Sequence, residues 1–253
     1  MKYAIFSDIH SNLEALQAFL KHSKEQGCEQ YACLGDIVGY GPNPKECVEL
    51  VKGLNCPIVV GNHDRMSCQL RLSSLLSMNP LASRAVTWTH NQLSEDAIEW
   101  IEELPLTQEL EHFTIVHASL EDPLLWVYID NKYNALSSFE RQEKQLCFYG
   151  HTHLPLCFIQ NRNEEKEFDD YLNNIDANYY KTISLEKDLK YIVNPGSIGQ
   201  PRDNDNRLSY AIFDSSNNKI EIQRVVYDFK TTQKKIIEAG LPERLAERLA
   251  IGE

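Results

Sequence analysis

The chain has 253 residues, of which 42% are hydrophobic, which is enough to bury a full core and argues against disorder. Acidic residues outnumber basic ones by 37 to 25, and the formal net charge of −12 excludes a basic surface that would track a long nucleic acid or an anionic membrane. No apolar run approaches the roughly 18 residues that cross a bilayer, and the N-terminus reaches polar residues too early for a signal peptide, so we expect a cytoplasmic protein without a membrane partner.

The first hundred residues alternate between strand and helix patterns. Segments 2–8, 30–36 and 56–64 are apolar and β-rich, whereas segments 12–27 and 43–54 have helical spacing. This order predicts an α/β layered fold, in which ligands collect at the carboxyl ends of the strands.

The middle of the chain begins with a helical pattern. It covers residues 67–104 and predicts helices that lie over the strands, with Pro105 closing them. Segments 113–119 and 145–153 predict two further short strands. Residues 162–190 are acidic and poorly periodic, which indicates an exposed surface insertion.

The last part of the chain predicts three strands and two short helices. The strands cover 190–197, 207–214 and 218–228, and the last two read as a hairpin. Helices are expected between 231 and 253, with Gly240 ending one and Pro242 starting the next.

Polar residues follow most of the predicted strands directly. They are Asp8, His10, Asp36, Asn62, His63, His117, His151 and His153. Mixed imidazole, carboxylate and amide ligands suit manganese, iron or zinc. Seven ligands drawn from such a set are too many for one tetrahedral ion and suit two ions that share a bridging carboxylate. No thiolate falls in the set, and the seven cysteines contain no C-x-x-C pair, so we expect reduced, mostly buried thiols.

The stretch "CFYGHTHLP" (147–155) places two histidines one residue apart. On a continuing strand, His151 and His153 would point to the same face and repel each other if both were protonated. A shared cation would resolve that repulsion. Taken alone, the tripeptide is also compatible with a polar loop at the end of a strand.

Five short blocks together resemble the calcineurin-like metallophosphoesterase superfamily. They are "DIH" (8–10), "GDIVG" (35–39), "GNHD" (61–64), "VH" (116–117) and "GHTH" (150–153). The later stretch "NPGSIGQPRD" (194–203) is similar to a loop of the small prokaryotic phosphodiesterase-like branch. The resemblance implies two mixed β-sheets packed as a sandwich and flanked by helices. It implies one such domain over 1–227, with insertions at 67–104 and 162–190, and a helical tail over 228–253.

The resemblance also implies roles for the strand-end residues. Asp36 would bridge two divalent or trivalent Mn, Fe or Zn ions. The first ion would be held by Asp8, His10, Asp36 and His153, and the second by Asp36, Asn62, His117 and His151. A hydroxide that bridges the metals would attack phosphorus in line, and His63 would protonate the leaving oxygen as the general acid.

Candidate substrate contacts lie outside these blocks. Arg65 and Arg202 could bind phosphate in bidentate fashion, although surface ion pairs are an alternative for both. Ser197 could donate to phosphate or belong to a structural loop. The stretch 120–133 carries three aromatic residues, Trp126 among them, that could stack on a nucleobase or pack an insertion.

The resemblance therefore predicts a phosphoesterase that hydrolyses phosphodiesters or nucleotide-type small molecules. A phosphomonoesterase or a Ser/Thr protein phosphatase would use the same site, and a non-catalytic scaffold would share the fold. The phosphatase branch has an Asp-Arg pair after its second block and Glu after its third, whereas this chain has "GDIVGYG" and "GNHD". The expected partner is a small phosphorylated substrate, and the oligomeric state stays open.

Overall fold

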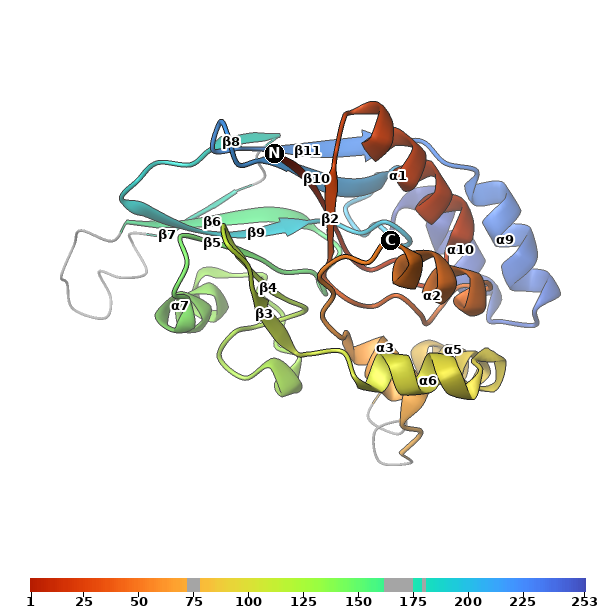
Figure 1. The fold of residues 1–253 in the computed structure, drawn as a ribbon. Coiled ribbons are helices and arrows are strands. Elements are labelled where there is room, and N and C mark those ends of the chain that lie inside the picture. Colours follow the sequence, from red (N-terminus) through yellow and green to blue (C-terminus); the bar gives the residue numbers. More distant parts are fainter. Residues whose placement is uncertain (72–77, 162–174, 179–180) are drawn as a thin grey trace.

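Two mixed β-sheets pack face to face with helices on their outer sides (Figure 1). The computed structural model of the chain describes residues 1–71, 78–161, 175–178 and 181–253. The fold class expected from the sequence is confirmed.

Within the described residues the first sheet has five strands. In spatial order they are β2 (Gln30–Cys33), β1 (Lys2–Phe6), β10 (Leu208–Asp214), β11 (Lys219–Val225) and β8 (Thr182–Ser184). The β1 strand runs parallel to β2 and antiparallel to β10. Strands β10 and β11 form the antiparallel hairpin that the sequence predicts.

The second sheet has six strands in the same part of the chain. Their order is β3 (Thr107–Glu109), β4 (Thr114–Val116), β5 (Leu146–Phe148), β9 (Leu189–Pro195), β6 (Pro155–Asn161) and β7 (Ile175–Asn178). The central strands β4, β5 and β9 are parallel, and the outer pairings are antiparallel.

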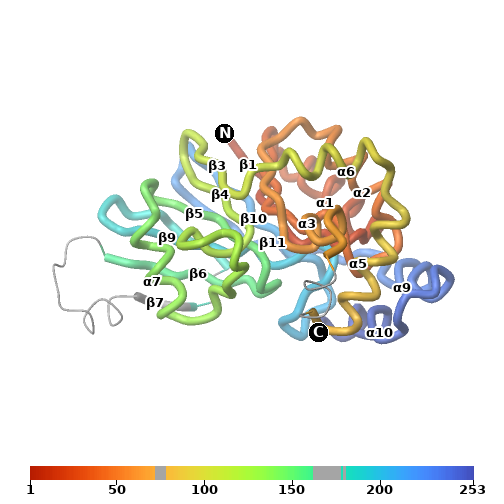
Figure 2. Tube along the Cα trace, turned by 90° about the horizontal axis from the view of Figure 1, so that it is seen from below, coloured from red at the N-terminus to blue at the C-terminus, as the bar shows by residue number. Residues whose placement is uncertain are grey.

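Helices cover the outer face of each sheet. The first sheet is covered by α1 (Leu13–Glu25) and α2 (Pro44–Gly53), and the second by α7 (Lys132–Arg141). Helices α3 (Asn62–Cys68), α5 (Pro80–Gln92) and α6 (Glu95–Glu102) follow one another, and a short 3-10 turn, η1 (Pro123–Leu125), precedes α7. The last two helices, α9 (Phe229–Glu238) and α10 (Glu243–Ile251), lie beside α5 (Figure 2).

Neighbouring residues of a strand serve different cores because their side chains alternate between the two faces. In β1, Ile5 lies between the sheets with Phe148 and Val193, whereas Phe6 packs beneath α1 against Phe19, with ring centroids 4.6 Å apart. Each such burial contributes roughly 1.5–3 kcal/mol. A short apolar strand such as β1 therefore packs against a helix with one face and against the second sheet with the other.

The elements differ from the sequence expectations in three respects. Segment 56–64 forms only one parallel bridge, between Cys33 and Ile58, because α3 already begins at Asn62. The surface insertion expected over 162–190 contains β7 and β8, which pair through their main chains with β6 and β11 and were not expected as strands. Residues 162–174 and 179–180 of that insertion lie outside the described residues. Strands β3 and β6 were not expected.

The seven cysteines are free thiols, and all except the half-buried Cys56 are buried. This agrees with the reduced, buried cysteines expected from the sequence. None of the described helices has the length and apolar character needed to cross a bilayer.

The carboxyl ends of the parallel strands are tied together by backbone hydrogen bonds. The Asp8 amide after β1 donates to the Gly35 carbonyl after β2 at 3.0 Å, and the Gly150 amide after β5 donates to the His117 carbonyl after β4 at 2.9 Å. The Gly199 amide after β9 donates to the Asp8 carbonyl at 2.9 Å and so joins the two sheets. These loops carry the polar residues that the sequence singles out.

Glycine at position 150 permits a close approach between the loops of the two sheets. A Cβ atom there would overlap the Ser7 hydroxyl and lie 2.8 Å from Asp8 Oδ2. We therefore expect Gly150→Ala to lower the free energy of unfolding by about 1–3 kcal/mol, as overpacking does elsewhere. Urea unfolding followed by circular dichroism measures the change.

The matched control is Gly53→Ala at the end of α2, where nothing lies within 4 Å of the added atom. That variant is expected to be neutral or more stable by about 0.5–1 kcal/mol, because alanine favours helix. Equal effects of the two substitutions would contradict the close approach at Gly150.

Candidate metal centre

Two buried clusters of metal-binding side chains lie where the strand-end loops meet. One consists of Asp8, His10 and His153, and the other consists of Asp36, His117 and His151. Within each cluster the potential ligand atoms lie within 4.8 Å of one another. The structure thus brings together six of the seven ligands expected from the sequence.

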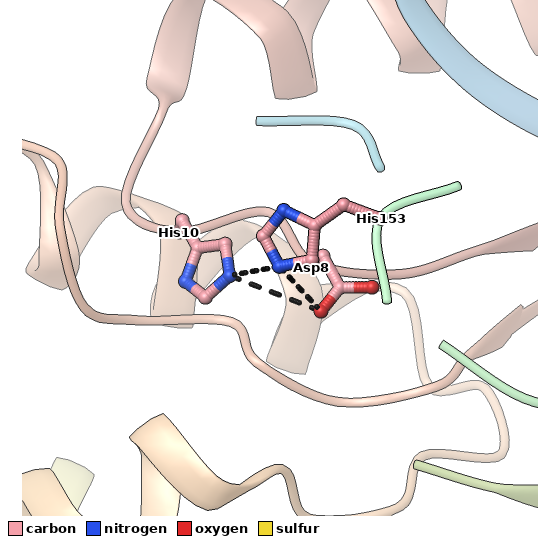
Figure 3. Close-up of side chains that lie close together, drawn as sticks. All are labelled: Asp8, His10 and His153. Carbon is pink, nitrogen blue, oxygen red and sulfur yellow. Dashed lines mark hydrogen bonds and ion pairs between the residues drawn. The ribbon is translucent and has the colours of Figure 1, made fainter. Parts of the chain in front are cut away.

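The first cluster is centred on one oxygen of Asp8 (Figure 3). Asp8 Oδ1 lies 3.3 Å from His153 Nε2 and 3.8 Å from His10 Nε2. The two imidazole nitrogens are 3.1 Å apart. All three side chains converge on one small volume although their residues are up to 145 positions apart in the chain.

Asp36 connects the two clusters. Its Oδ2 atom lies 3.3 Å from His117 Nε2 in the second cluster and 3.7 Å from His10 Nε2 in the first. Asn62, the seventh expected ligand, places its Oδ1 atom 3.2 Å from His117 Nε2. Asp36 Oδ2 therefore lies within reach of both clusters.

In each of the two aspartates, one carboxylate oxygen contacts the backbone and the other faces the site. Asp8 Oδ2 accepts a hydrogen bond from the His151 amide at 3.0 Å, and Asp36 Oδ1 accepts one from the His63 amide at 2.8 Å. The other oxygens, Asp8 Oδ1 and Asp36 Oδ2, are buried and accept no hydrogen bond from the described residues. Burying a carboxylate charge is costly, and a cation bound between each of these oxygens and the imidazoles that face it would offset that cost.

The histidines are oriented with their bare nitrogens toward the site. Three of them hold Nδ1 against a backbone carbonyl: His10 at Val38 (3.1 Å), His117 at Leu34 (2.7 Å) and His153 at Gln200 (2.6 Å). When such a ring is neutral, the proton on Nδ1 leaves a lone pair on Nε2, which is the usual arrangement of histidines that bind metals. In the neutral tautomers, His10 and His153 then face each other at 3.1 Å without a proton between them, and a metal ion bound there would remove that unfavourable contact.

His151 is turned the other way round. Its Nε2 atom lies 2.8 Å from the Trp126 carbonyl, so Nδ1 is left for the second cluster. His151 and His153 do not continue a strand with a shared face, because β5 ends at Phe148 and both histidines have positive φ. The loop instead directs one imidazole to each cluster.

Backbone strain is concentrated in this region. Five of the seven expected ligands have positive φ, namely Asp8, His10, Asp36, His151 and His153. Each such residue costs of order 1–3 kcal/mol and persists only where the surrounding structure holds it. The hydrogen bonds between loops and the packing between sheets supply that restraint.

Burial and charge set the protonation of the histidines in different directions. Burial lowers the pKa of His10 and His153, and it lowers the pKa of His151 to about 3. Burial also acts to lower the pKa of His117, but the negative charge of Asp36, whose Oδ2 atom lies 3.3 Å from His117 Nε2, outweighs it and raises that pKa to about 9. Without an ion, His117 therefore carries the proton that neutralises Asp36, and an ion bound there must displace it.

His63 lies beside the clusters and belongs to neither. Its ring packs 4.4 Å from the Tyr40 ring and 5.0 Å from the His10 ring, measured between centroids. Burial lowers the pKa of His63 to about 4, so the ring is neutral at pH 7 in this state. Its Nδ1 atom is buried without a partner among the described residues, which leaves Nε2 as the accessible nitrogen.

Asp64 is a residue of the site that the sequence reasoning missed. Its two oxygens accept hydrogen bonds from the amides of Val38 and Gly61, each at 3.0 Å. The contacts fasten the loop of Asp36 to the first turn of α3, and burial raises the pKa of Asp64 to about 7. The sequence contains a signal for Asp64, because Gly61 followed by Asp64 three residues later is a capping pattern at the start of a helix.

The three candidate phosphate contacts lie in different environments. Ser197 is fully buried, donates to the Asp8 carbonyl at 2.8 Å and accepts from the Gln200 amide at 2.8 Å, so it supports the loop beneath Asp8. Arg202 lies over the Tyr40 ring at 5.9 Å and donates to the Gln200 side chain at 2.8 Å. Arg65 lies half-buried on α3.

The aromatic stretch 120–133 contacts the metal centre. The Tyr128 ring stacks on His151 with centroids 4.1 Å apart, and 47% of Tyr128 stays exposed. The Trp126 ring lies 5.9 Å from that of His117. These two side chains therefore form part of the rim of the site.

Comparisons with known proteins agree with this geometry. Residues 1–218 match the family model of the calcineurin-like phosphoesterase superfamily domain. The chain is 40% identical to an uncharacterized protein of Methanocaldococcus jannaschii over 98% of this chain and 97% of that protein. A metallophosphoesterase of known structure from Sphaerobacter thermophilus is 40% identical, with a TM-score of 0.85 over 100% of this chain and 99% of the other. A hypothetical protein from Pyrococcus horikoshii shares the fold at 21% identity, with a TM-score of 0.76 over 100% and 98%.

The pKa of His117 predicts how metal affinity depends on pH. Because that pKa is raised to about 9, an ion must displace one proton below this pH, whereas the other buried histidines release none near neutrality. We expect the apparent affinity of chelator-treated protein for Zn²⁺ to rise about tenfold per pH unit between about 6.5 and 8.5. Competition with a chromophoric chelator measures it.

The matched variant is His117→Gln, which removes this proton. It should bind Zn²⁺ more weakly and with a flatter pH dependence. An affinity of the unmodified protein that does not change with pH would contradict the protonated His117.

Proposed function

The chain belongs to the calcineurin-like phosphoesterase superfamily, and from this membership we propose that it is a metal-dependent phosphoesterase acting on phosphodiesters or nucleotide-type small molecules. One observation carries the proposal. The Oδ2 atom of Asp36 lies within 3.7 Å of imidazole nitrogens from both clusters and accepts no hydrogen bond from the described residues. That arrangement suits two cations on either side of one carboxylate.

The donor set is compatible with two Mn, Fe or Zn ions. Nitrogen and oxygen donors without thiolate match these metals. Asp8, His10, Asp36 and His153 would hold one ion, and Asp36, Asn62, His117 and His151 would hold the other. Bound there, two ions would acidify a water molecule and neutralise charge on a phosphoryl group.

The protein itself contributes orientation and a proton donor. Backbone carbonyls fix the rings of His10, His117 and His153, so little reorganisation is needed when substrate binds. His63 would donate from Nε2 to the leaving oxygen. A phosphoryl oxyanion beside this ring would raise its pKa from about 4 and place the proton there.

The reaction class is supported by the relative from Sphaerobacter thermophilus, which is named a metallophosphoesterase. The preference for diesters is part of our proposal, and kinetics test it. Protein that has been treated with a chelator and then supplied with Mn²⁺ should have a higher kcat/KM for bis-p-nitrophenyl phosphate than for p-nitrophenyl phosphate. A preference for the monoester would favour a phosphomonoesterase, and inactivity with Mn²⁺, Fe²⁺ and Zn²⁺ on both would favour a non-catalytic scaffold.

Substitution of His63 separates catalysis from metal binding. We expect His63→Ala to lower kcat by about 10²–10⁴-fold, which is the usual contribution of general acid catalysis, while metal content stays at the original level. Asp36→Asn should lose metal as well as activity, because it weakens the shared ligand. Metal analysis beside steady-state kinetics measures both.

A histidine remote from the site provides the control. His112 lies between β3 and β4 and is paired with Glu111 at 4.0 Å. His112→Ala should retain both activity and metal. If His63→Ala lost its metal, the assignment of this residue to proton transfer would be wrong.

A further inference from the structure

A pocket of about 190 Å³ opens beside the metal centre, between α3 and the η1 turn. Its walls are formed by Arg65, Met66, Gln69, Arg71, Leu124 and Trp126. A cavity of about 150 Å³ is large enough for a benzene ring, so this pocket holds a single compact group rather than a whole nucleotide.

The pocket shares a wall with the metal centre. Trp126 lines the pocket, and its carbonyl accepts the hydrogen bond from His151 Nε2 at 2.8 Å. On the opposite wall, Arg65 follows Asn62 by one turn of α3. A substrate bound at the metal centre can therefore extend into the pocket directly.

The charge of the pocket differs from that of the whole chain. The chain has a net charge of −12, yet both charged groups among the lining residues are guanidinium groups, those of Arg65 and Arg71. Among the described residues neither guanidinium forms an ion pair or a side-chain hydrogen bond. The nearby Glu102 carboxylate instead accepts a hydrogen bond from Gln69 at 3.0 Å.

The geometry points to a binding site for a second phosphate of the substrate, next to the phosphoryl group that is hydrolysed. Guanidinium groups bind phosphate oxygens in bidentate fashion, and two of them suit a multiply charged phosphate better than a neutral ring. Leu124 and Trp126 form the apolar wall of the pocket, opposite the two guanidinium groups. This inference rests on the proposed function and narrows the substrate class to compounds with at least two phosphates, such as nucleoside polyphosphates.

The test measures binding with probes that cannot be turned over. Metal-loaded protein is titrated by calorimetry with methylenediphosphonate and, separately, with orthophosphate. Unmodified protein should bind the diphosphonate at least tenfold more tightly. Arg65→Gln and Arg71→Gln should each weaken diphosphonate binding on the order of tenfold, the usual size of a lost charged hydrogen bond, and change orthophosphate binding less than about twofold.

The matched control is Arg84→Gln, which removes an exposed guanidinium on α5 outside this pocket. It should leave both affinities unchanged. Equal diphosphonate affinity in the Arg65 and Arg71 variants and in the unmodified protein would overturn the inference, because the preference would then come from the metals alone. Melting temperatures of all variants exclude loss of fold as the cause.

Failure of the proposed function gives a different result. A protein that binds diphosphonate through Arg65 and Arg71 but hydrolyses no phosphoester would refute catalysis and keep the binding site. A protein that hydrolyses phosphoesters with unaltered diphosphonate binding in both variants would keep the catalysis and refute the second phosphate site.

Discussion

The arrangement of the site depends on two buried carboxylates whose two oxygens have different surroundings. Asp8 and Asp36 each give one oxygen to a backbone amide and leave the other unsatisfied inside the protein. The amides belong to His151 and His63, so each carboxylate fixes a loop that carries another functional residue. The unsatisfied oxygens, the bare imidazole nitrogens and the neutral state of most of these histidines all suit positive charge that the protein itself does not supply.

The sandwich of two sheets holds this costly arrangement in place. Loops after parallel strands of both sheets are joined by main-chain hydrogen bonds, and Ser197 and Asp64 hold the segments beneath Asp8 and beside Asp36. The core between the sheets, with Ile5, Phe148 and Val193, supplies the stability that the strained loops consume. The rigidity of the site therefore depends on packing in the core far from it.

The sequence predicts which residues converge, but not how each one is directed. The convergence of Asp8, Asp36 and His117 could be predicted because these residues follow strands, and the carboxyl ends of parallel strands meet at one edge of a sheet. The separate directions of His151 and His153 depend on positive φ angles, which tertiary contacts impose and local patterns do not reveal. Strands β7 and β8 were missed because pairing with neighbouring strands, rather than apolar alternation, defines them.

The strained ligands also bear on how such a protein evolves. Positions 8, 36, 151 and 153 hold non-glycine residues where glycine would relieve the backbone, and their charged or polar side chains face one another in the interior. A lineage released from selection for metal binding would gain stability from almost any smaller or apolar replacement there. Loss of these ligands would thus be thermodynamically downhill for the fold.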